Sequence, residues 1–371
     1  MTAVVVAGAV ANKPGSAGEA WVRMSWVRGL ERLGLDVWFV EEIEDADESA
    51  VDWFRSVSAR FLPEERAALI AGSETVAGPS LDELSEVAAE STLVNISGHL
   101  ALPRLFDAFR RRVMVDIDPG FTQFWHAEGL PGARVEGHDL HFTIGERIGS
   151  PDCPIPTSGV DWRPVRQPVV LDDWPIVEPN DVDRFTTVGS WRPPFGPIEY
   201  DGRRYGLKVH EFRRFVELPA WSPHKFELAL DMHPADDADR RALKEHGWHL
   251  VDPRRVADDM DTFRAYVEGS TAEFSVAQGL YVETACGWFS DRSVRYLASG
   301  RPVLVQDTGF SRILPTGSGL VAFRTLEEAV AGADDIVARY AEHAAAARRI
   351  AEKCFAAERV LARFCEEAGI G

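Results

Sequence analysis

The segment Gly287–Phe310, GWFSDRSVRYLASGRPVLVQDTGF, carries the strongest local signals in this chain of 371 residues. Ser290 and Asp291 are residue types that favour a helix N-cap. The Gly-Arg-Pro sequence at 300–302 supplies a C-cap glycine and a proline that prevents the helix from continuing. The segment therefore predicts a short helix over residues 290–299 that leads directly into a buried strand.

The start of this helix has the features of a diphosphate site. The first turn of a helix presents free backbone N–H groups and the positive end of the dipole, and both attract phosphate oxygens. The strand that follows, over residues 302–306, ends at the carboxyl edge of the expected sheet, where open α/β folds bind their ligands. We expect Ser290, Asp291, Arg292 and Ser293 to contact the diphosphate, and Gln306, Asp307 and Thr308 to hold sugar hydroxyls, with Gly309 in the same donor-binding loop.

Strands and helices alternate along the whole chain, which predicts parallel sheets. The first forty residues read as strand, glycine-containing loop, helix and strand, a βαβ unit with a right-handed crossover. Further elements are expected as strands at 92–97, 113–117 and 141–144 and helices at 102–111 and 206–219, with a proline-rich connection at Pro151–Pro179. We therefore predict two Rossmann-like doubly wound domains, residues 1–160 and 161–345, and a C-terminal helix over 346–371 that packs back on the first domain.

Composition and charge narrow the function. A hydrophobic fraction of 45% and a charged fraction of 27% are typical of a globular protein. The net charge of −19 argues against broad binding of nucleic acid or anionic membranes. The four cysteines have no metal-ligand spacing, and the N-terminal MTAVVVAGAV reads as a strand rather than a signal peptide, so a cytoplasmic location is expected.

Three motifs together resemble the GT-B glycosyltransferases. LASGRPVLVQDTG, within 297–309, is similar to their donor-binding helix and strand, and IPTSGVDWRP, at 155–164, is similar to the signature with which they leave the first domain. The strand VGSWR followed by GLKVHEF resembles the place of their basic pair, which makes Arg192 and Lys208 the candidates. Glu273 lies where these proteins approach the donor.

The resemblance implies transfer of a sugar from a nucleoside-diphosphate sugar, bound by the second domain, to an acceptor bound by the first. It implies no metal and no cofactor beyond this co-substrate. The two glutamates of many retaining enzymes are replaced here by Gly287 and Arg295, so the stereochemical outcome stays open. The chain is also similar to a looser group of bacterial GT-B proteins related to the CgeB type. A UDP-sugar epimerase and a non-catalytic binding protein of the same fold remain the alternatives.

The first domain contributes candidates for catalysis. General-base catalysis needs a group that takes the acceptor proton near neutral pH, and His99 and Asp118 are the two candidates. Asp116 and Asp118 have the spacing of a DxD metal motif, but an acceptor-side role for Asp118 is favoured, because its loop leaves a strand at the carboxyl end. Further expectations are a cleft loop with Gly15, Ser16 and Gly18, acceptor roles for Gln123 or His126, and no zinc at His138 and His141, which are predicted on opposite faces of a strand.

Overall fold

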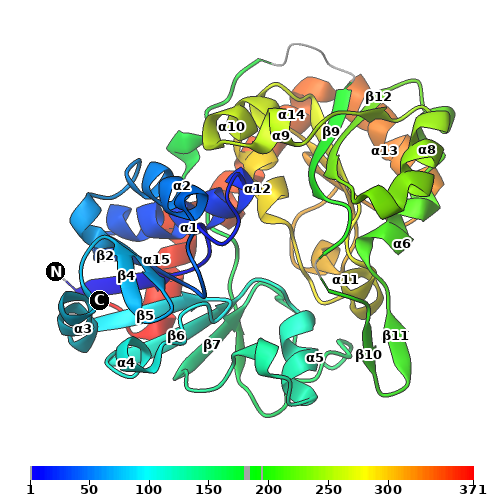
Figure 1. The fold of residues 1–371 in the computed structure, drawn as a ribbon. Coiled ribbons are helices and arrows are strands. Elements are labelled where there is room, and N and C mark those ends of the chain that lie inside the picture. The colour runs from blue at the N-terminus through cyan, green and yellow to red at the C-terminus, as the bar shows by residue number, and fades with distance from the viewer. Residues whose placement is uncertain (1, 179–183, 194) are drawn as a thin grey trace. The chain divides into compact units, whose positions relative to one another are not determined.

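The computed structural model describes residues 2–178, 184–193 and 195–371 and divides the chain into two compact units (Figure 1). Unit 1 consists of Met1–Gly149, Ile155–Val170 and Ala356–Gly371. Unit 2 consists of Ser150–Pro154 and Leu171–Phe355. Pro179, the last residue of the expected connection, lies outside the described residues.

Unit 1 is built on an eight-stranded sheet of order β4-β3-β2-β1-β5-β6-β7-β8, in which every pair is parallel except β3–β4. The strands are β1 (Ala3–Ala7), β2 (Asp36–Ile43), β3 (Ala67–Ala71), β4 (Glu74–Ala77), β5 (Ser91–Ile96), β6 (Arg111–Asp116), β7 (Leu140–Thr143) and β8 (Trp162–Pro164). Its α-helices are α1 (Ala17–Arg32), α2 (Glu48–Ser58), α3 (Leu81–Ala89), α4 (Pro103–Phe106), α5 (Phe121–Ala127) and α15 (Ala357–Ala368). The chain order places β2 on one side of β1 and β5 on the other, so the switch point of the sheet lies between β1 and β5.

Unit 2 repeats the plan with a six-stranded parallel sheet of order β13-β12-β9-β14-β15-β16. The strands are β9 (Arg184–Ser190), β12 (Lys225–Asp231), β13 (His249–Leu250), β14 (Ala272–Ser275), β15 (Val303–Gln306) and β16 (Leu320–Phe323). Its α-helices are α6 (Lys208–Phe212), α7 (Leu218–Trp221), α8 (Asp237–Glu245), α9 (Arg254–Ala257), α10 (Met260–Glu268), α11 (Gly279–Thr284), α12 (Asp291–Ala298), α13 (Leu326–Ala338) and α14 (Tyr340–Ile350). Its switch point lies between β9 and β14.

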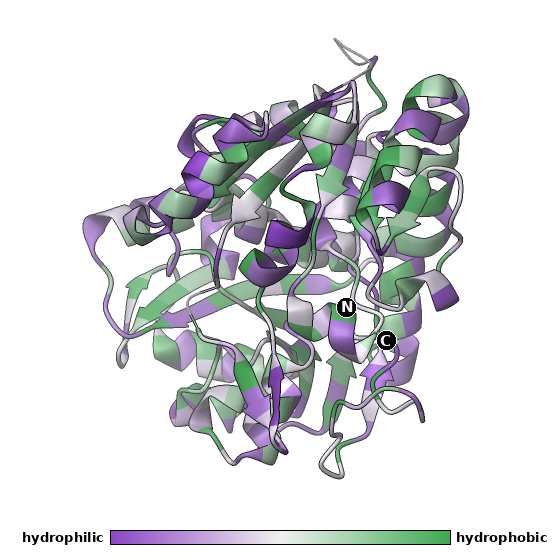
Figure 2. Ribbon diagram, turned by 90° about the vertical axis from the view of Figure 1, so that its right-hand side faces the viewer, coloured by the Kyte–Doolittle hydropathy of each residue, from purple (hydrophilic) through white to green (hydrophobic). Residues whose placement is uncertain are grey.

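The two sheets confirm the predicted fold class, because apolar strands form the interior of each unit. Figure 2 shows mainly hydrophobic strands flanked by helices with hydrophilic outer faces. In unit 1, for example, Val5, Ile70 and Leu93 from three strands share one buried cluster with Leu84 of α3. Within the described parts of the chain, no helix is long and apolar enough to cross a membrane.

Several element boundaries differ from the predictions. The helix expected over 102–111 is only the four residues of α4, since β6 already begins at Arg111. The helix expected over 206–219 is divided into α6, a 3-10 turn at Arg213–Phe215 and α7, whose second residue is Pro219. A two-stranded antiparallel hairpin, β10 (Ile198–Tyr200) and β11 (Arg203–Tyr205), was not predicted.

The C-terminal helix α15 belongs to unit 1 and packs on α1 (Figure 1). It is preceded by α14 and a π-helical turn, Ala351–Phe355, that belong to unit 2, so the division falls at residue 356 rather than at 346. The ring of Phe364 lies 5.1 Å from that of Trp26 in an edge-to-face contact and 4.8 Å from that of Phe142. A β-carbon on Gly29 would lie 2.4 Å from Cδ1 of Leu361, so the two helices meet where α1 has no side chain.

Removal of the Leu361 side chain tests this packing. Leu361 is fully buried, and we expect Leu361→Ala to lower the free energy of unfolding by about 3 kcal/mol, through lost apolar burial and the cavity left behind. The neighbouring Arg363 has 72% of its side chain exposed, so Arg363→Ala is the matched control, with an expected change below about 0.5 kcal/mol. Urea unfolding followed by tryptophan fluorescence measures both; equal effects would contradict the packing role.

Candidate functional site

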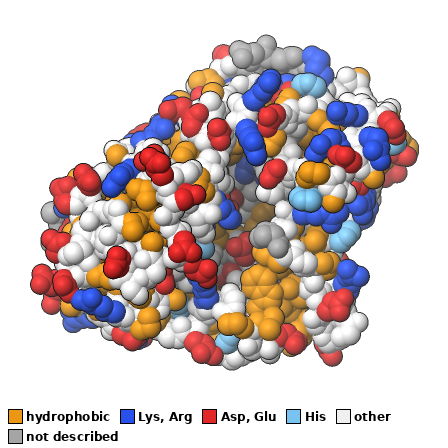
Figure 3. Space-filling view, viewed as in Figure 1, with side chains coloured by type: hydrophobic (Ala, Val, Ile, Leu, Met, Phe, Trp, Pro, Cys, Tyr) orange, Lys and Arg blue, Asp and Glu red, His pale blue; other side chains and the backbone are white. Residues whose placement is uncertain are grey.

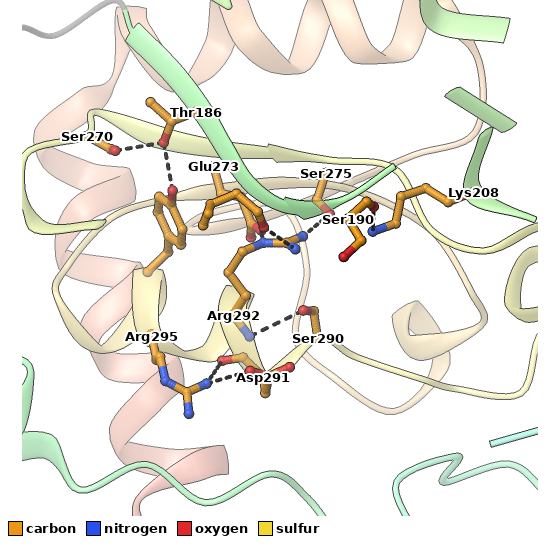
Figure 4. A network of polar contacts seen from close by, with 12 residues as sticks. Thr186, Ser190, Lys208, Ser270, Glu273, Ser275, Ser290, Asp291, Arg292 and Arg295 are labelled. Carbon is orange, nitrogen blue, oxygen red and sulfur yellow. Dashed lines mark hydrogen bonds and ion pairs between the residues drawn. The ribbon is translucent and has the colours of Figure 1, made fainter. Parts of the chain in front are cut away.

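Two neighbouring strands end at the switch point of unit 2. β9 ends at Ser190 and β14 at Ser275, and their carboxyl ends lie at the same edge because the strands pair in parallel. The first residue of α6, Lys208, and the first turn of α12 reach the same place (Figure 4). A β-carbon on Gly189 would lie 3.3 Å from Nη1 of Arg292 and 3.9 Å from Nζ of Lys208, so two cations converge on the end of β9.

The first cation, Arg292, is held inside unit 2 by neighbouring strands. Its Nε donates to Oε1 of Glu273 at 2.6 Å, its Nη2 to Oγ of Ser275 at 2.6 Å and its Nη1 to the carbonyl of Val188 at 2.9 Å. The Glu273 side chain is fully buried and that of Arg292 is 13% exposed. The charge of Arg292 is therefore largely neutralised by Glu273 before any ligand binds.

The second cation, Lys208, is partly buried and has no carboxylate partner among the described residues. Its Nζ donates to the carbonyl of Ser190 at 3.3 Å. Burial and the nearby Arg292 guanidinium lower the pKa of Lys208 to about 7. Lys208 is therefore the group at this edge whose charge responds most to a bound anion.

The buried Glu273–Arg292 pair gives a stability prediction. We expect Glu273→Gln to lower the free energy of unfolding by about 3 kcal/mol, because it leaves a buried guanidinium without its counter-charge. Asp261→Asn removes a carboxylate that is 58% exposed and 3.5 Å from Arg264, so this control is expected to change stability by less than about 0.5 kcal/mol. Chemical unfolding of both variants decides; a stable Glu273→Gln variant would show that the pair contributes little.

Arg192, the expected partner of Lys208, is engaged elsewhere. Its Nε donates to Oδ1 of Asp236 at 2.8 Å. The hairpin β10–β11 lies in the chain between Ser190 and Lys208, which explains the unusually long spacing between the two basic residues of the motif. The basic pair at the end of β9 is thus Lys208 with Arg292. Figure 3 shows further Lys and Arg side chains on unit 2 near α6, where Arg213 and Arg214 are half exposed.

The first turn of α12 has the predicted capped geometry. Oγ of Ser290 accepts the amide of Arg292 at 3.2 Å, which leaves other first-turn amides without an intrahelical acceptor. Oδ2 of Asp291 lies 2.7 Å from Nη1 of the buried Arg295, so this carboxylate is already paired. The Ser293 side chain is buried. The part of α12 available to an anion is therefore its backbone, with Lys208 beside it.

The side chains of the loop after β15 are used within the protein. Gln306 accepts the amide of Ala277 at 3.1 Å and donates to Glu211 at 2.6 Å. Asp307 accepts the amide of Gly309 at 2.9 Å and pairs with Arg324. The Thr308 hydroxyl donates to the carbonyl of Trp288. All three side chains that were expected to hold sugar hydroxyls are therefore bonded to other residues of unit 2.

In unit 1, Asp116 and Asp118 follow β6 but have different surroundings. The Asp116 carboxylate is fully buried and accepts hydrogen bonds from Thr122, Gln123 and Thr143 at 2.7 to 2.8 Å. Asp118 is exposed, and its side chain has no hydrogen-bond partner among the described residues. Desolvation of its carboxyl by the surrounding protein, together with the negative charges of Asp116 and Glu19, raises the pKa of Asp118 to about 6. Asp116 is thus a structural group, and Asp118 is the available one.

His99 is a poorer base than Asp118. Burial and the charges of Arg23 and Arg134 lower the pKa of His99 to about 3, so its ring is neutral and weakly basic near pH 7. It follows two residues in the left-handed region, Ser97 at φ 56° and Gly98 at φ 64°, in the loop after β5. His99 and Asp118 follow adjacent strands, β5 and β6. Of the two, only Asp118 has a pKa suited to proton transfer near neutral pH.

Two glutamates, Glu41 and Glu19, hold the loop after β1 in place, and neither role was indicated by the sequence. Buried Glu41 of β2 accepts the amides of Ala11 at 2.6 Å and Asn12 at 3.0 Å. Glu19 pairs with Lys13 at 3.1 Å and with buried Arg23; these cations hold its pKa down, to about 2, although burial acts to raise it. Of the expected loop residues, Gly15 has φ 75° and Ser16 precedes α1, whereas Gly18 lies inside the first turn of α1.

The remaining candidates of unit 1 are mostly structural. Gln123 is buried between Asp116 and the amide of Gly120, and His126 is partly buried near the end of α5. The prediction that His138 and His141 lie on opposite faces was wrong, because β7 begins at Leu140, and both rings bond the carbonyl of Val135 at 3.0 to 3.1 Å. Within the described ranges, no group of three or more His, Cys, Asp or Glu side chains is placed to hold a metal ion.

Comparison with known proteins gives a structural likeness without a sequence match. No protein-family model and no curated protein sequence matches the chain. HepE from Anabaena in complex with UDP-glucose has a TM-score of 0.61 at 12% identity, and the match covers 100% of both chains. Sucrose-phosphate synthase from Thermosynechococcus elongatus has a TM-score of 0.58 at 11% identity, over 99% of this chain and 98% of the other. An alpha-glucosyltransferase in complex with UDP-glucose and DNA has a TM-score of 0.62 at 9% identity, over 99% of each.

These structures are GT-B glycosyltransferases, and each matches nearly the full length of the chain with its two doubly wound sheets. The structural likeness does not extend to the CgeB type in particular, which stays a prediction. The chain therefore has the GT-B glycosyltransferase fold.

Proposed function

We propose that the protein transfers a sugar from a nucleoside-diphosphate sugar to an acceptor hydroxyl. One observation carries this proposal: Lys208, a cation without a carboxylate partner in the described chain, lies at the end of β9 beside Arg292, the first-turn residue of α12. A cation and a helix N-terminus at a switch point suit a diphosphate. The GT-B fold, and the UDP or UDP-glucose present in the structures of HepE and the alpha-glucosyltransferase that it resembles, support a UDP-sugar as donor.

In this proposal, the departing diphosphate is stabilised by Lys208 and by the first-turn amides of α12, next to the Arg292 guanidinium that Glu273 already neutralises. These groups are fixed before the reaction and act where negative charge develops, as a metal ion does in other enzymes. We propose that no divalent metal is required, that Asp118 of unit 1 takes the proton of the acceptor hydroxyl, and that the protein is cytoplasmic.

Calorimetric titration tests the donor site. We expect UDP to bind more tightly than UMP, because only UDP places a second phosphate at Lys208, and we expect EDTA to leave binding unchanged. GDP and TDP titrated in parallel identify the base. If none of these nucleotides binds, a non-catalytic protein of the same fold is the better description.

Incubation with UDP-glucose alone tests the reaction. Slow release of UDP and glucose, with water as acceptor, is expected of a transferase and is detected by mass spectrometry and sugar chromatography. Formation of an epimeric UDP-sugar would contradict the transferase proposal and support the epimerase alternative.

A further inference from the structure

The segment that carries Lys208 lies outside the main sheet of unit 2. After Ser190 the chain leaves the sheet, forms the hairpin β10–β11 and returns as α6, a helix of only five residues that begins at Lys208. A short helix after a separate hairpin has few backbone hydrogen bonds of its own. The position of the Lys208 ammonium therefore depends on contacts from other elements.

The start of α11 supplies these contacts. Oε1 of Gln278, the residue before α11, accepts the backbone amide of Lys208 at 2.6 Å. The amide of Leu280 donates to the carbonyl of Gly206 at 2.8 Å, and Oε1 of Glu283 accepts the amide of Gly206 at 3.1 Å. Both polar groups of Gly206 and the amide of Lys208 are thus bonded to residues 278–283.

Gly279 makes the approach of these two segments possible. A β-carbon at this position would lie 2.8 to 2.9 Å from the backbone atoms of Gly206, a distance at which the backbone must move. The segment before Lys208 and the start of α11 are therefore in direct backbone contact. Any side chain at 279 would push Gly206, and Lys208 two residues later, away from the end of β9.

We infer that Gln278 and Gly279 are positioning residues for Lys208, and that they set the affinity of unit 2 for the diphosphate group of a nucleotide. The identity of the ligand in this inference rests on the proposed function. The contacts of Gln278 and Gly279 with the segment 206–208 do not depend on it. The rest of α6 is held independently, because Val209 and Phe212 are buried and Glu211 is bonded by Gln306. Loss of the Gln278 side chain therefore frees the backbone amide of Lys208 at the start of α6, while Val209 and Phe212 keep the helix packed on unit 2.

The first experiment measures UDP binding to Gln278→Ala and Gly279→Ala by calorimetry. We expect UDP to bind about tenfold more weakly to Gln278→Ala, and more weakly still to Gly279→Ala, with UMP binding changed less than threefold. Thr325→Ala is the matched control. It removes the N-cap of α13 in unit 2, where Oγ1 of Thr325 accepts a hydrogen bond from the backbone amide of Glu328 at 3.2 Å, and we expect it to bind UDP with wild-type affinity. Equal losses in all three variants would overturn the inference in favour of general loosening.

The second experiment needs no nucleotide. The chain has five lysines, so competitive labelling with acetic anhydride between pH 6 and 9, read by mass spectrometry, reports the pKa of Lys208 directly. When Lys208 is no longer held beside Arg292, its pKa is expected to rise by at least one unit in Gln278→Ala, with the profile of Lys225 unchanged. An unchanged Lys208 profile would overturn the positioning role even if UDP binds, whereas failure of the wild type to bind UDP would contradict only the proposed function.

Discussion

Replacement of Lys208 by alanine is expected to lower kcat/KM for UDP-sugar turnover by about 10²- to 10³-fold, the usual loss when one fixed group that stabilises developing charge is removed. The reason lies in the charge balance at the end of β9. Arg292 is paired with buried Glu273, whereas the Lys208 ammonium donates to the carbonyl of Ser190 and has no carboxylate partner among the described residues. Lys208 therefore contributes the positive charge that the departing diphosphate needs.

Arg192→Ala is the matched control for this prediction. The Arg192 guanidinium is already paired with Asp236, at 2.6 Å, and does not point its charge at the end of β9, so we expect its loss to change kcat/KM by less than about threefold. The sequence motif alone made both residues candidates. A large loss in Arg192→Ala with a small one in Lys208→Ala would show that the structure assigns the wrong cation to the diphosphate.

The pH dependence of donor binding gives a second measure of the same role. Burial and Arg292 lower the pKa of Lys208 to about 7, so its amine is charged below this pH and increasingly neutral above it. A diphosphate favours the charged form, so binding above pH 7 takes up a proton, and UDP affinity is expected to fall about tenfold per pH unit. Lys208→Arg keeps its charge throughout, so this decrease should disappear in that variant.

The fold was predictable because its signals are local. A serine cap, a glycine C-cap and a proline delimit α12 and β15, and the structure places these elements at Asp291–Ala298 and Val303–Gln306, within two residues of the prediction. Alternation of apolar strands with helices then determines a parallel sheet without knowledge of distant contacts. Where local signals conflict, as at Pro219 in the helix expected over 206–219, the boundaries were wrong.

The site was predictable only in part, because it depends on which distant residues meet. Lys208 and Arg292 were both named from motifs, yet the motif paired Lys208 with Arg192. That pairing fails because Asp236 holds Arg192, and no local pattern connects residues 44 positions apart. Gln278 gave no signal, because it belongs to no motif in the sequence, and its importance follows only from its contact with the backbone amide of Lys208.

The same limit applies to the two aspartates after β6. In the sequence, Asp116 and Asp118 differ only in position. In the structure, hydrogen bonds from three side chains fix Asp116, whereas Asp118 is left exposed one residue before Pro119. Tertiary contacts therefore separate a structural carboxylate from an available one.

Asp118→Asn is expected to lower kcat for transfer by about 10²- to 10⁴-fold, the usual contribution of a general base, with UDP affinity unchanged. The carboxylate must be deprotonated to accept the acceptor proton. Because its pKa is raised to about 6, kcat/KM should rise tenfold per pH unit below pH 6 and level off above it. With the loss of charged Lys208 above pH 7, the expected profile is a bell with its maximum between these two values.

His99→Gln separates the two candidate bases. The pKa of His99 is lowered to about 3, so the rising limb near pH 6 cannot be its titration, and this limb should persist in His99→Gln with kcat reduced less than about tenfold. In Asp118→Asn the limb should disappear. The opposite pattern, with the limb lost on removal of His99, would assign the proton transfer to the histidine. It would also mean that the burial and the charges of Arg23 and Arg134, which lower the pKa of His99 and keep its ring neutral here, are compensated when the acceptor binds.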